Sequence, residues 1–99
     1  MEDLPMKSIT LFYLEHCPYC IKARRALDEL TRENPAYSAI RIDWIEESKE
    51  PVLAGKYDYY YVPTIYYEGV KLYEADPSEN YEDIKAKIQA ALDTVLREG

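Results

Sequence analysis

The hydrophobic and polar positions in the first third of the chain predict a strand and then a helix. Residues 7–14, KSITLFYL, form a short run of β-branched, aromatic and aliphatic side chains that is typical of a buried strand. Residues 18–34 are mainly helix formers with apolar positions at mostly helical spacing, and Asn34-Pro35 stops the pattern. We therefore expect a strand that leads into a helix of about four turns.

The middle of the chain predicts a second strand, a short helix and a hairpin. Residues 37–45, YSAIRIDWI, alternate with the two-residue period of a strand. Residues 46–57 begin with acidic side chains and contain a proline suited to a first helical turn, so we expect a short helix there. Residues 63–75 predict two strands that are joined by a turn at Glu68-Gly69.

The last segment predicts an amphipathic helix that starts at Asp76. In the sequence DPSE, Asp76 is the expected N-cap, Pro77 the first helical residue and Glu79 the residue that closes a capping box. Apolar side chains then recur every three or four positions, at Tyr81, Ile84, Ile88, Ala91, Leu92 and Val95. The predicted order is β-α-β-α-β-β-α. Because no repeat, low-complexity tract or linker interrupts it, we expect one domain over residues 1–99.

Composition and charge exclude several function classes. The 99 residues are 47% hydrophobic and 31% charged, as in folded globular proteins. The formal net charge of −7 would repel nucleic acid and anionic lipid, and no segment is apolar over the length of a bilayer span. The N-terminus, MEDLPMKS, lacks the features of a secretory signal. We therefore expect a cytoplasmic monomer without a nucleic-acid or membrane partner.

The only two cysteines, Cys17 and Cys20, stand three positions apart at the start of the first predicted helix. In a reducing compartment, such a pair is seldom a structural disulfide unless it carries redox chemistry. Zinc usually takes four Cys or His ligands, and the chain has two cysteines and one histidine, so we expect no metal site. The pair is either redox-active or a chance pair, and its place between a strand and a helix favours the first interpretation.

The start of the helix predicts different roles for the two thiols. Cys17 lies near unpaired N–H groups and the positive end of the helix dipole, which favour its thiolate, the reactive nucleophile. Cys20 lies one turn inside on the same side, where it is less exposed and can reach back. We expect Cys17 to attack a substrate disulfide and Cys20 then to attack Cys17, which releases the reduced substrate. Pro18 suits the first helical position, and Tyr19 is placed to touch whatever docks.

We expect the polar side chains near the cysteines to contribute less to the redox chemistry than the two thiols. His16 either tunes Cys17 or is merely solvated, and solvation is the commoner state of a loop histidine. Lys22, Arg24 and Arg25 add positive charge to the helix, with a modest effect on the thiol if they face solvent.

The motifs CPYC, between a strand and a helix, and YVPT, at residues 61–64, resemble the thioredoxin superfamily across nearly the whole chain. CPYC is also the cysteine motif of typical dithiol glutaredoxins. The resemblance implies a thioredoxin fold, with a four-stranded mixed sheet flanked by three helices. It further implies a cis Val62–Pro63 bond with Pro63 facing the cysteines, a Val62 backbone that pairs with substrate, and Thr64 at the start of the central antiparallel strand.

Two glutathione contacts of typical glutaredoxins are absent from the sequence. Leu14 stands where they carry a lysine, and residues 73–77, YEADP, replace a Gly-Gly followed by acidic residues. Residues 56–69 instead resemble the thioredoxin pattern of Lys-Tyr, spacer, Pro-Thr, strand and Gly. The reductant is therefore left open between glutathione and a donor of the thioredoxin-reductase type, and no tightly bound cofactor is expected.

The chain has eleven tyrosines, and five of them surround Pro63 in the sequence: Tyr57, Tyr59, Tyr60, Tyr61 and Tyr66. They form either a rim for an extended peptide or a cover for the sheet. Tyr61 and Tyr19 are the two that we expect near the site.

These observations predict a thiol–disulfide oxidoreductase that acts as an electron carrier in redox homeostasis and reduces protein or mixed disulfides. One alternative is a glutathione-dependent iron–sulfur cluster carrier. Another is a non-catalytic interaction module in which the cysteines are incidental.

Overall fold

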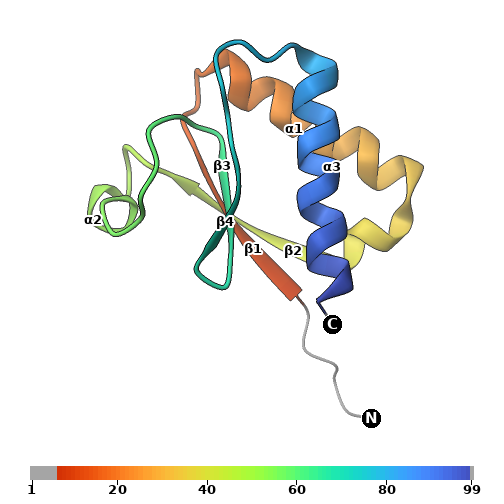
Figure 1. Cartoon of the computed structure of the whole chain (residues 1–99). Coiled ribbons are helices and arrows are strands. Elements are labelled where there is room, and N and C mark those ends of the chain that lie inside the picture. Colours follow the sequence, from red (N-terminus) through yellow and green to blue (C-terminus); the bar gives the residue numbers. More distant parts are fainter. Residues whose placement is uncertain (1–6, 99) are drawn as a thin grey trace.

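A computed structural model describes residues 7–98 as one four-stranded mixed sheet with helices on both faces (Figure 1). The elements in chain order are β1 (Lys7–Tyr13), α1 (Pro18–Glu33), the 3₁₀ helix η1 (Pro35–Ala39), β2 (Ile40–Glu46), α2 (Pro51–Ala54), β3 (Thr64–Tyr67), β4 (Val70–Glu74) and α3 (Tyr81–Arg97). The predicted α/β order with three α-helices is confirmed. The predictions that fall on residues 1–6 and 99, including the character of the N-terminus, lie outside the described residues.

The strand order β2-β1-β3-β4 brings four chain segments to one edge of the sheet. β1 and β2 run parallel and end together, with Tyr13 beside Glu46. β3 runs antiparallel to both of its neighbours, so Thr64 at its start lies between Phe12 of β1 and Glu74 of β4. The ends of β1, β2 and β4 and the start of β3 therefore meet. This edge carries the loop with the cysteines and the segment that precedes β3.

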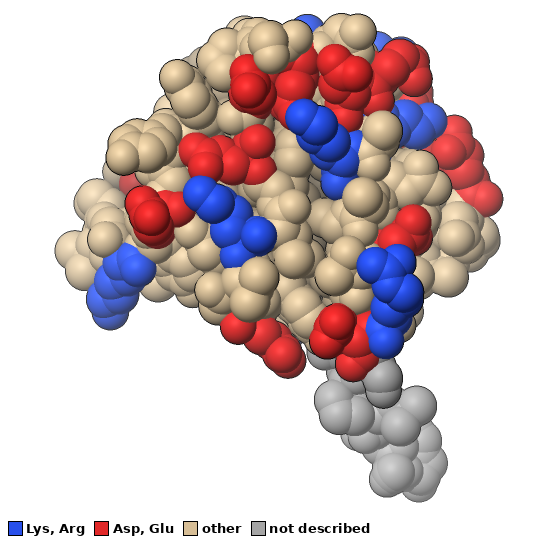
Figure 2. Space-filling view, viewed as in Figure 1, with Lys and Arg blue, Asp and Glu red and all other residues tan. Residues whose placement is uncertain are grey.

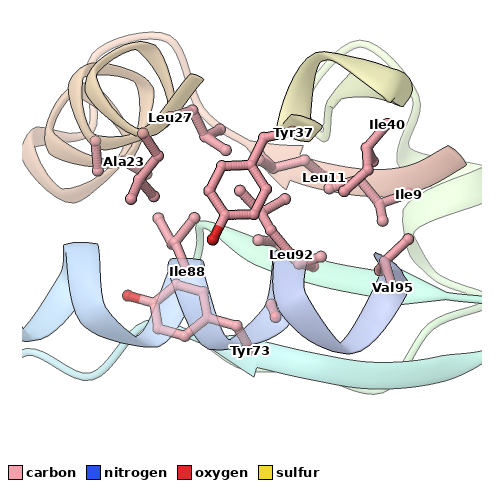
Figure 3. Packing of buried hydrophobic residues seen from close by; sticks show 14 of the residues in the cluster. Ile9, Leu11, Ala23, Leu27, Tyr37, Ile40, Tyr73, Ile88, Leu92 and Val95 are labelled. Atoms are coloured by element: carbon pink, nitrogen blue, oxygen red, sulfur yellow. The ribbon is translucent and has the colours of Figure 1, made fainter. Parts of the chain in front are cut away.

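The main core lies between the sheet and the two long helices, α1 and α3, which pack on each other (Figures 1 and 3). Each helix buries one stripe at helical spacing. In α1 the buried residues are Cys20, Ala23, Ala26, Leu27 and Leu30, and in α3 they are Ile84, Ile88, Ala91, Leu92 and Val95. These stripes meet Ile9 and Leu11 of β1 and Ile65 of β3. The core fixes α1, and with it the cysteine pair, against the sheet.

A second, aromatic cluster covers the opposite face of the sheet, where α2 lies (Figure 1). Leu11 and Phe12 are neighbours in β1, so their side chains point to opposite faces of the sheet. Phe12 therefore lies on the face opposite to Leu11, where it is fully buried. Its ring contacts those of Tyr57, Tyr59 and Tyr66 at centroid distances of 4.7, 5.1 and 6.2 Å. Three of the five tyrosines around Pro63 therefore cover the sheet.

Two predicted boundaries are wrong, and long-range contacts explain the first. Residues 37–39 belong to η1 rather than to the second strand. The Asn34 side chain accepts the Ala36 N–H at 3.2 Å and starts this turn. Tyr37 is buried, and its hydroxyl donates to Asp93 Oδ1 of α3 at 2.5 Å (Figure 3 shows its ring in the core). The tie to α3 holds Tyr37 in a turn and outside the sheet.

The other wrong boundary is the start of the last helix. α3 begins at Tyr81, and its N-cap is Asn80, which forms a capping box with Asp83. Asp76 instead accepts the Ser78 N–H at 2.9 Å within a separate turn. Glu79 reaches back to the Asp76 N–H at 3.1 Å, so the capping pattern DPSE is used in that turn, before the helix.

The remaining predicted elements are confirmed. The predicted short helix is α2, which is confined to residues 51–54. The hairpin turns at Glu68 and Gly69, whose φ angles of 49° and 82° are both in the left-handed region that favours glycine. No helix within residues 7–98 combines the length and apolar character needed to cross a bilayer.

Candidate functional site

Cys17 is the N-cap of α1, directly after the loop that follows β1. Its carbonyl accepts the Ile21 N–H at 3.1 Å, the first bond of the helix, and its own N–H donates to the Leu14 carbonyl at 3.3 Å. Pro18 occupies the first helical position, as predicted. The side chain is half-buried, so the sulfur is held at the positive end of the helix and remains accessible.

Cys20 lies one turn further along α1 and is only 6% exposed. Its sulfur accepts the Leu14 N–H at 3.5 Å. Burial raises the pKa of the Cys20 thiol to about 12, and the neighbouring Cys17 sulfur adds to this shift. The two sulfurs are free thiols in the structure. The pair is thus asymmetric, with one accessible and one buried thiol.

The segment before β3 lies across from the cysteines. The Val62–Pro63 peptide bond is cis, and the Val62 carbonyl accepts from Cys17 Sγ at 3.7 Å. Pro63 is fully buried, and its carbonyl accepts the Ala75 N–H at 3.0 Å, which ties the segment to the end of β4. The structure therefore brings Val62 and Pro63 to the cysteine pair.

Thr64 and the tyrosines predicted at the site occupy different environments. Thr64 is fully buried, and its hydroxyl donates to the Tyr61 carbonyl, so it stabilises the segment that precedes β3. Tyr61 is 52% exposed beside Val62, and Tyr60 is 89% exposed. Tyr19 is half-buried, and its hydroxyl donates to the Pro77 carbonyl at 3.0 Å. Of these residues, Tyr60 and Tyr61 offer the free aromatic surface.

Comparison with known proteins identifies the family to which the chain belongs. The sequence model of the glutaredoxin family matches residues 9–72, which include both cysteines and Pro63. The chain belongs to the glutaredoxin family. It is also 34% identical over 61 residues to a thioredoxin from Methanocaldococcus jannaschii, across 62% of this chain and 69% of that protein. Family membership places the chain in the thioredoxin superfamily and indicates thiol redox function.

Solved structures show the same fold at lower identity. A malarial protein aligns with a TM-score of 0.58 at 21% identity, covering 89% of this chain and 99% of its own. A mutant thioredoxin from Halobacterium salinarum aligns with a TM-score of 0.55 at 18% identity, covering 88% of this chain and 75% of its own. These matches establish the thioredoxin fold.

Three basic residues of α1 in this glutaredoxin-family chain lie over aromatic rings, and the Lys22 ammonium is 5.7 Å from the Tyr19 ring centroid. The Arg24 guanidinium stacks over the Trp44 ring at 4.1 Å. The Arg25 guanidinium lies 4.6 Å from the Tyr81 ring centroid and pairs with Glu29 at 3.4 Å. Arg24 also lines a hollow that contains Leu14 and Cys20. His16 is exposed beside Cys17.

Two carboxylates that hold the site together were not identified from the sequence. Glu46, at the end of β2, is buried and accepts the Glu15 N–H at 3.1 Å and the Ser48 N–H at 2.7 Å. The Ser48 hydroxyl is the main cause that lowers the pKa of Glu46. Glu74, at the end of β4, accepts the N–H groups of Tyr60 and Tyr61 at 2.6 and 2.8 Å. Because these partners are distant in sequence, no local pattern reveals them.

A third carboxylate, the buried Glu79, braces the loop between β4 and α3. Its Oε1 accepts from the Tyr73 hydroxyl at 2.8 Å, and its Oε2 lies 2.8 Å from Lys87 Nζ. Burial raises the pKa of the Tyr73 hydroxyl, which therefore stays protonated and donates. The loop is thus fixed beside Tyr19. Within residues 7–98, no group of three or more His, Cys, Asp or Glu side chains is arranged to hold a metal ion.

Proposed function

We propose that the chain is a thiol–disulfide oxidoreductase that reduces protein or mixed disulfides through Cys17 and Cys20. The contrast between the two thiols supports this best. Cys17 is accessible at a helix N-terminus, and Cys20 is buried one turn inside with a raised pKa. Such a pair suits an attacking and a resolving role, respectively. The cis Val62–Pro63 segment beside Cys17 offers a backbone surface for an extended substrate.

In the first step, the Cys17 thiolate attacks one sulfur of the substrate disulfide. A Cys17–substrate disulfide forms, the substrate S–S bond breaks, and the other substrate sulfur leaves as a thiolate that takes a proton from water. In the second step, Cys20 loses its proton and attacks Cys17 Sγ. The Cys17–Cys20 disulfide forms, and the substrate leaves as a second thiol. The substrate gains two electrons and two protons: the cysteine pair supplies both electrons and the Cys20 proton, and water supplies the other proton.

The electron donor that restores the two thiols is a thiol system, either glutathione or a reductase of the thioredoxin-reductase type. Leu14 is half-buried where typical glutaredoxins carry a lysine, and it offers glutathione no charge. The Asp76 carboxylate, in the segment that replaces the Gly-Gly, is already bonded to Ser78. Both features favour the reductase. Reduction in this direction suits a reducing compartment, so we propose a cytoplasmic site of action.

Turnover assays with insulin as the disulfide substrate test this proposal. The wild-type protein should catalyse reduction with NADPH and thioredoxin reductase, and less well with glutathione and glutathione reductase. Cys17→Ser should abolish turnover, because no other accessible thiol can attack. Glu33→Gln, an exposed change at the far end of α1, is the control and should retain activity. Undiminished turnover by Cys17→Ser would overturn the proposal.

A further inference from the structure

A groove leads away from Cys17 along the side of the molecule that carries α2. It consists of two hollows that share Ser48. The first, of about 380 Å³, is lined by Leu14, Glu15, His16, Cys17, Glu46 and Ser48. The second, of about 420 Å³, includes Glu47, Ser48, Pro51, Tyr59 and Tyr60 in its lining. Because Ser48 lies in both linings, the two hollows adjoin, and together they reach from Cys17 to Tyr60. We refer to the two adjoining hollows as the groove.

The glutamates that line this groove are not matched by positively charged side chains in the same lining. Within residues 7–98, its lining contains Glu15, Glu46 and Glu47 but no lysine or arginine. Glu15 is paired with the exposed Lys49, 3.5 Å away, and Glu46 is occupied by the loop amides. Glu47 accepts the Tyr59 hydroxyl on Oε1 at 2.6 Å, and no residue in the range 7–98 donates to its Oε2. Glu47 is therefore the charge available to an occupant.

The far end of the groove presents an aromatic side chain on a fixed backbone. Tyr60 is 89% exposed, yet its N–H and that of Tyr61 both donate to Glu74 Oε2. Lys71 Nζ holds the other oxygen of Glu74 at 2.7 Å. The carbonyl of Asp58, just before these residues, accepts the Tyr66 hydroxyl at 2.6 Å. A large ring that is exposed on an ordered backbone can bind a partner at a low entropy cost.

We propose that this groove binds a lysine- or arginine-bearing segment of the protein substrate, next to the disulfide that Cys17 attacks. Glu47 supplies the counter-charge, and the Tyr60 ring contacts the cation or its aliphatic stem. The net charge of −7 adds a long-range attraction for such a segment. Acidic side chains also gather at the end of the molecule where α3 begins (Figure 2). The proposal rests on the proposed function, because it needs Cys17 as the attacking thiol.

Three synthetic cysteine peptides test the proposal. Each carries nitrothiobenzoate in a disulfide on its cysteine, and they differ only in the flanking pair, which is Lys-Arg, Gln-Gln or Glu-Glu. The second-order rate constant of nitrothiobenzoate release by the reduced protein is measured in a single turnover. We expect the Lys-Arg peptide to react about tenfold faster than the Glu-Glu peptide at low ionic strength, and the ratio to fall as salt is added.

Matched variants distinguish the effect of the groove on these rates from the effect of the net charge. Glu47→Gln should lower the Lys-Arg to Glu-Glu ratio by about threefold or more, because a nearby charge acts far more strongly than a distant one. Glu33→Gln makes the same charge change at the far end of α1 and should leave the ratio nearly unchanged. Tyr60→Ser should slow the Lys-Arg peptide selectively, and Tyr60→Phe should restore its rate because the ring face is kept.

Equal effects of Glu47→Gln and Glu33→Gln, or equal rates for all three peptides, would overturn the groove proposal. The Gln-Gln peptide tests the proposed function separately. If it reacts with wild type but not with Cys17→Ser, the oxidoreductase assignment stands whatever the charge preference. If none of the peptides reacts in a Cys17-dependent way, the proposed function itself fails.

Discussion

The burial of Cys20 predicts an unusual pH dependence for the second step of the proposed reaction. The species that attacks Cys17 is the Cys20 thiolate, and burial raises the pKa of this thiol to about 12. A raised pKa means less thiolate at neutral pH. Below the pKa, the thiolate fraction rises about tenfold for each pH unit, so the resolving rate constant should rise with the same slope.

The size of the effect separates a buried from an ordinary thiol. Between pH 8.5 and 9.5, a thiol with a pKa near 12 gains thiolate about tenfold, whereas a thiol with the usual pKa of about 8.5 gains less than about twofold. Burial, the largest cause of the shift, persists when Cys17 is bonded to substrate. The steep rise is therefore expected for the mixed disulfide as well.

Stopped-flow mixing of the reduced protein with a symmetric aryl disulfide measures this rate. Attack by Cys17 releases one aryl thiol in a phase that depends on disulfide concentration. Resolution by Cys20 releases the second in a first-order phase that does not. Cys20→Ser should show only the first phase, which identifies the second. A first-order rate constant that levels off near pH 8.5, or that does not vary with pH, would refute the role given to burial.

Three further predictions concern the scaffold, measured as the free energy of unfolding in urea. Leu92→Ala removes a side chain that is 2% exposed and should cost about 2–5 kcal/mol, whereas Val52→Ala, at a position 77% exposed, should change the value by less than about 0.5 kcal/mol. Asn80→Ala removes the N-cap of α3 and should cost about 0.5–2 kcal/mol, so an unchanged midpoint would contradict the assigned boundary. Tyr73→Phe leaves the buried Glu79 without one donor and should cost about 1–3 kcal/mol; a neutral result would show that water replaces the hydroxyl.

The local patterns predicted β1, α1 and the hairpin because each depends on neighbours in the chain. A short run of strand-forming side chains defines β1, helical spacing defines α1, and the positive φ angles of Glu68 and Gly69 define the turn. Of the two boundaries that failed, only the first depends on a distant partner. Tyr37 is held in a turn by Asp93 of α3. At the second boundary, Glu79 closes a local turn with the Asp76 N–H, and a separate capping box of Asn80 and Asp83 starts the helix.

The candidate site, too, could be predicted from the sequence only in part. The helical pattern from Pro18 onward predicted that Cys17 and Cys20 lie at the start of a helix, and the resemblance to a family supplied the approach of Pro63. The glutamates that position the loops could not be found from the sequence. Glu74 bonds to amides 13 and 14 residues away, and Glu46 to an amide 31 residues away, through pairings that only the sheet order creates.

The most direct test of the central claim is the position of the first covalent bond to the substrate. Cys20→Ser protein is incubated with a disulfide-containing protein, and the adduct is mapped by mass spectrometry. We predict a stable mixed disulfide on Cys17 that added thiol reverses, and little adduct with Cys17→Ser because Cys20 is buried. Adduct formation on Cys20 in the Cys17→Ser protein, at a rate equal to that of Cys17 in the Cys20→Ser protein, would contradict the account.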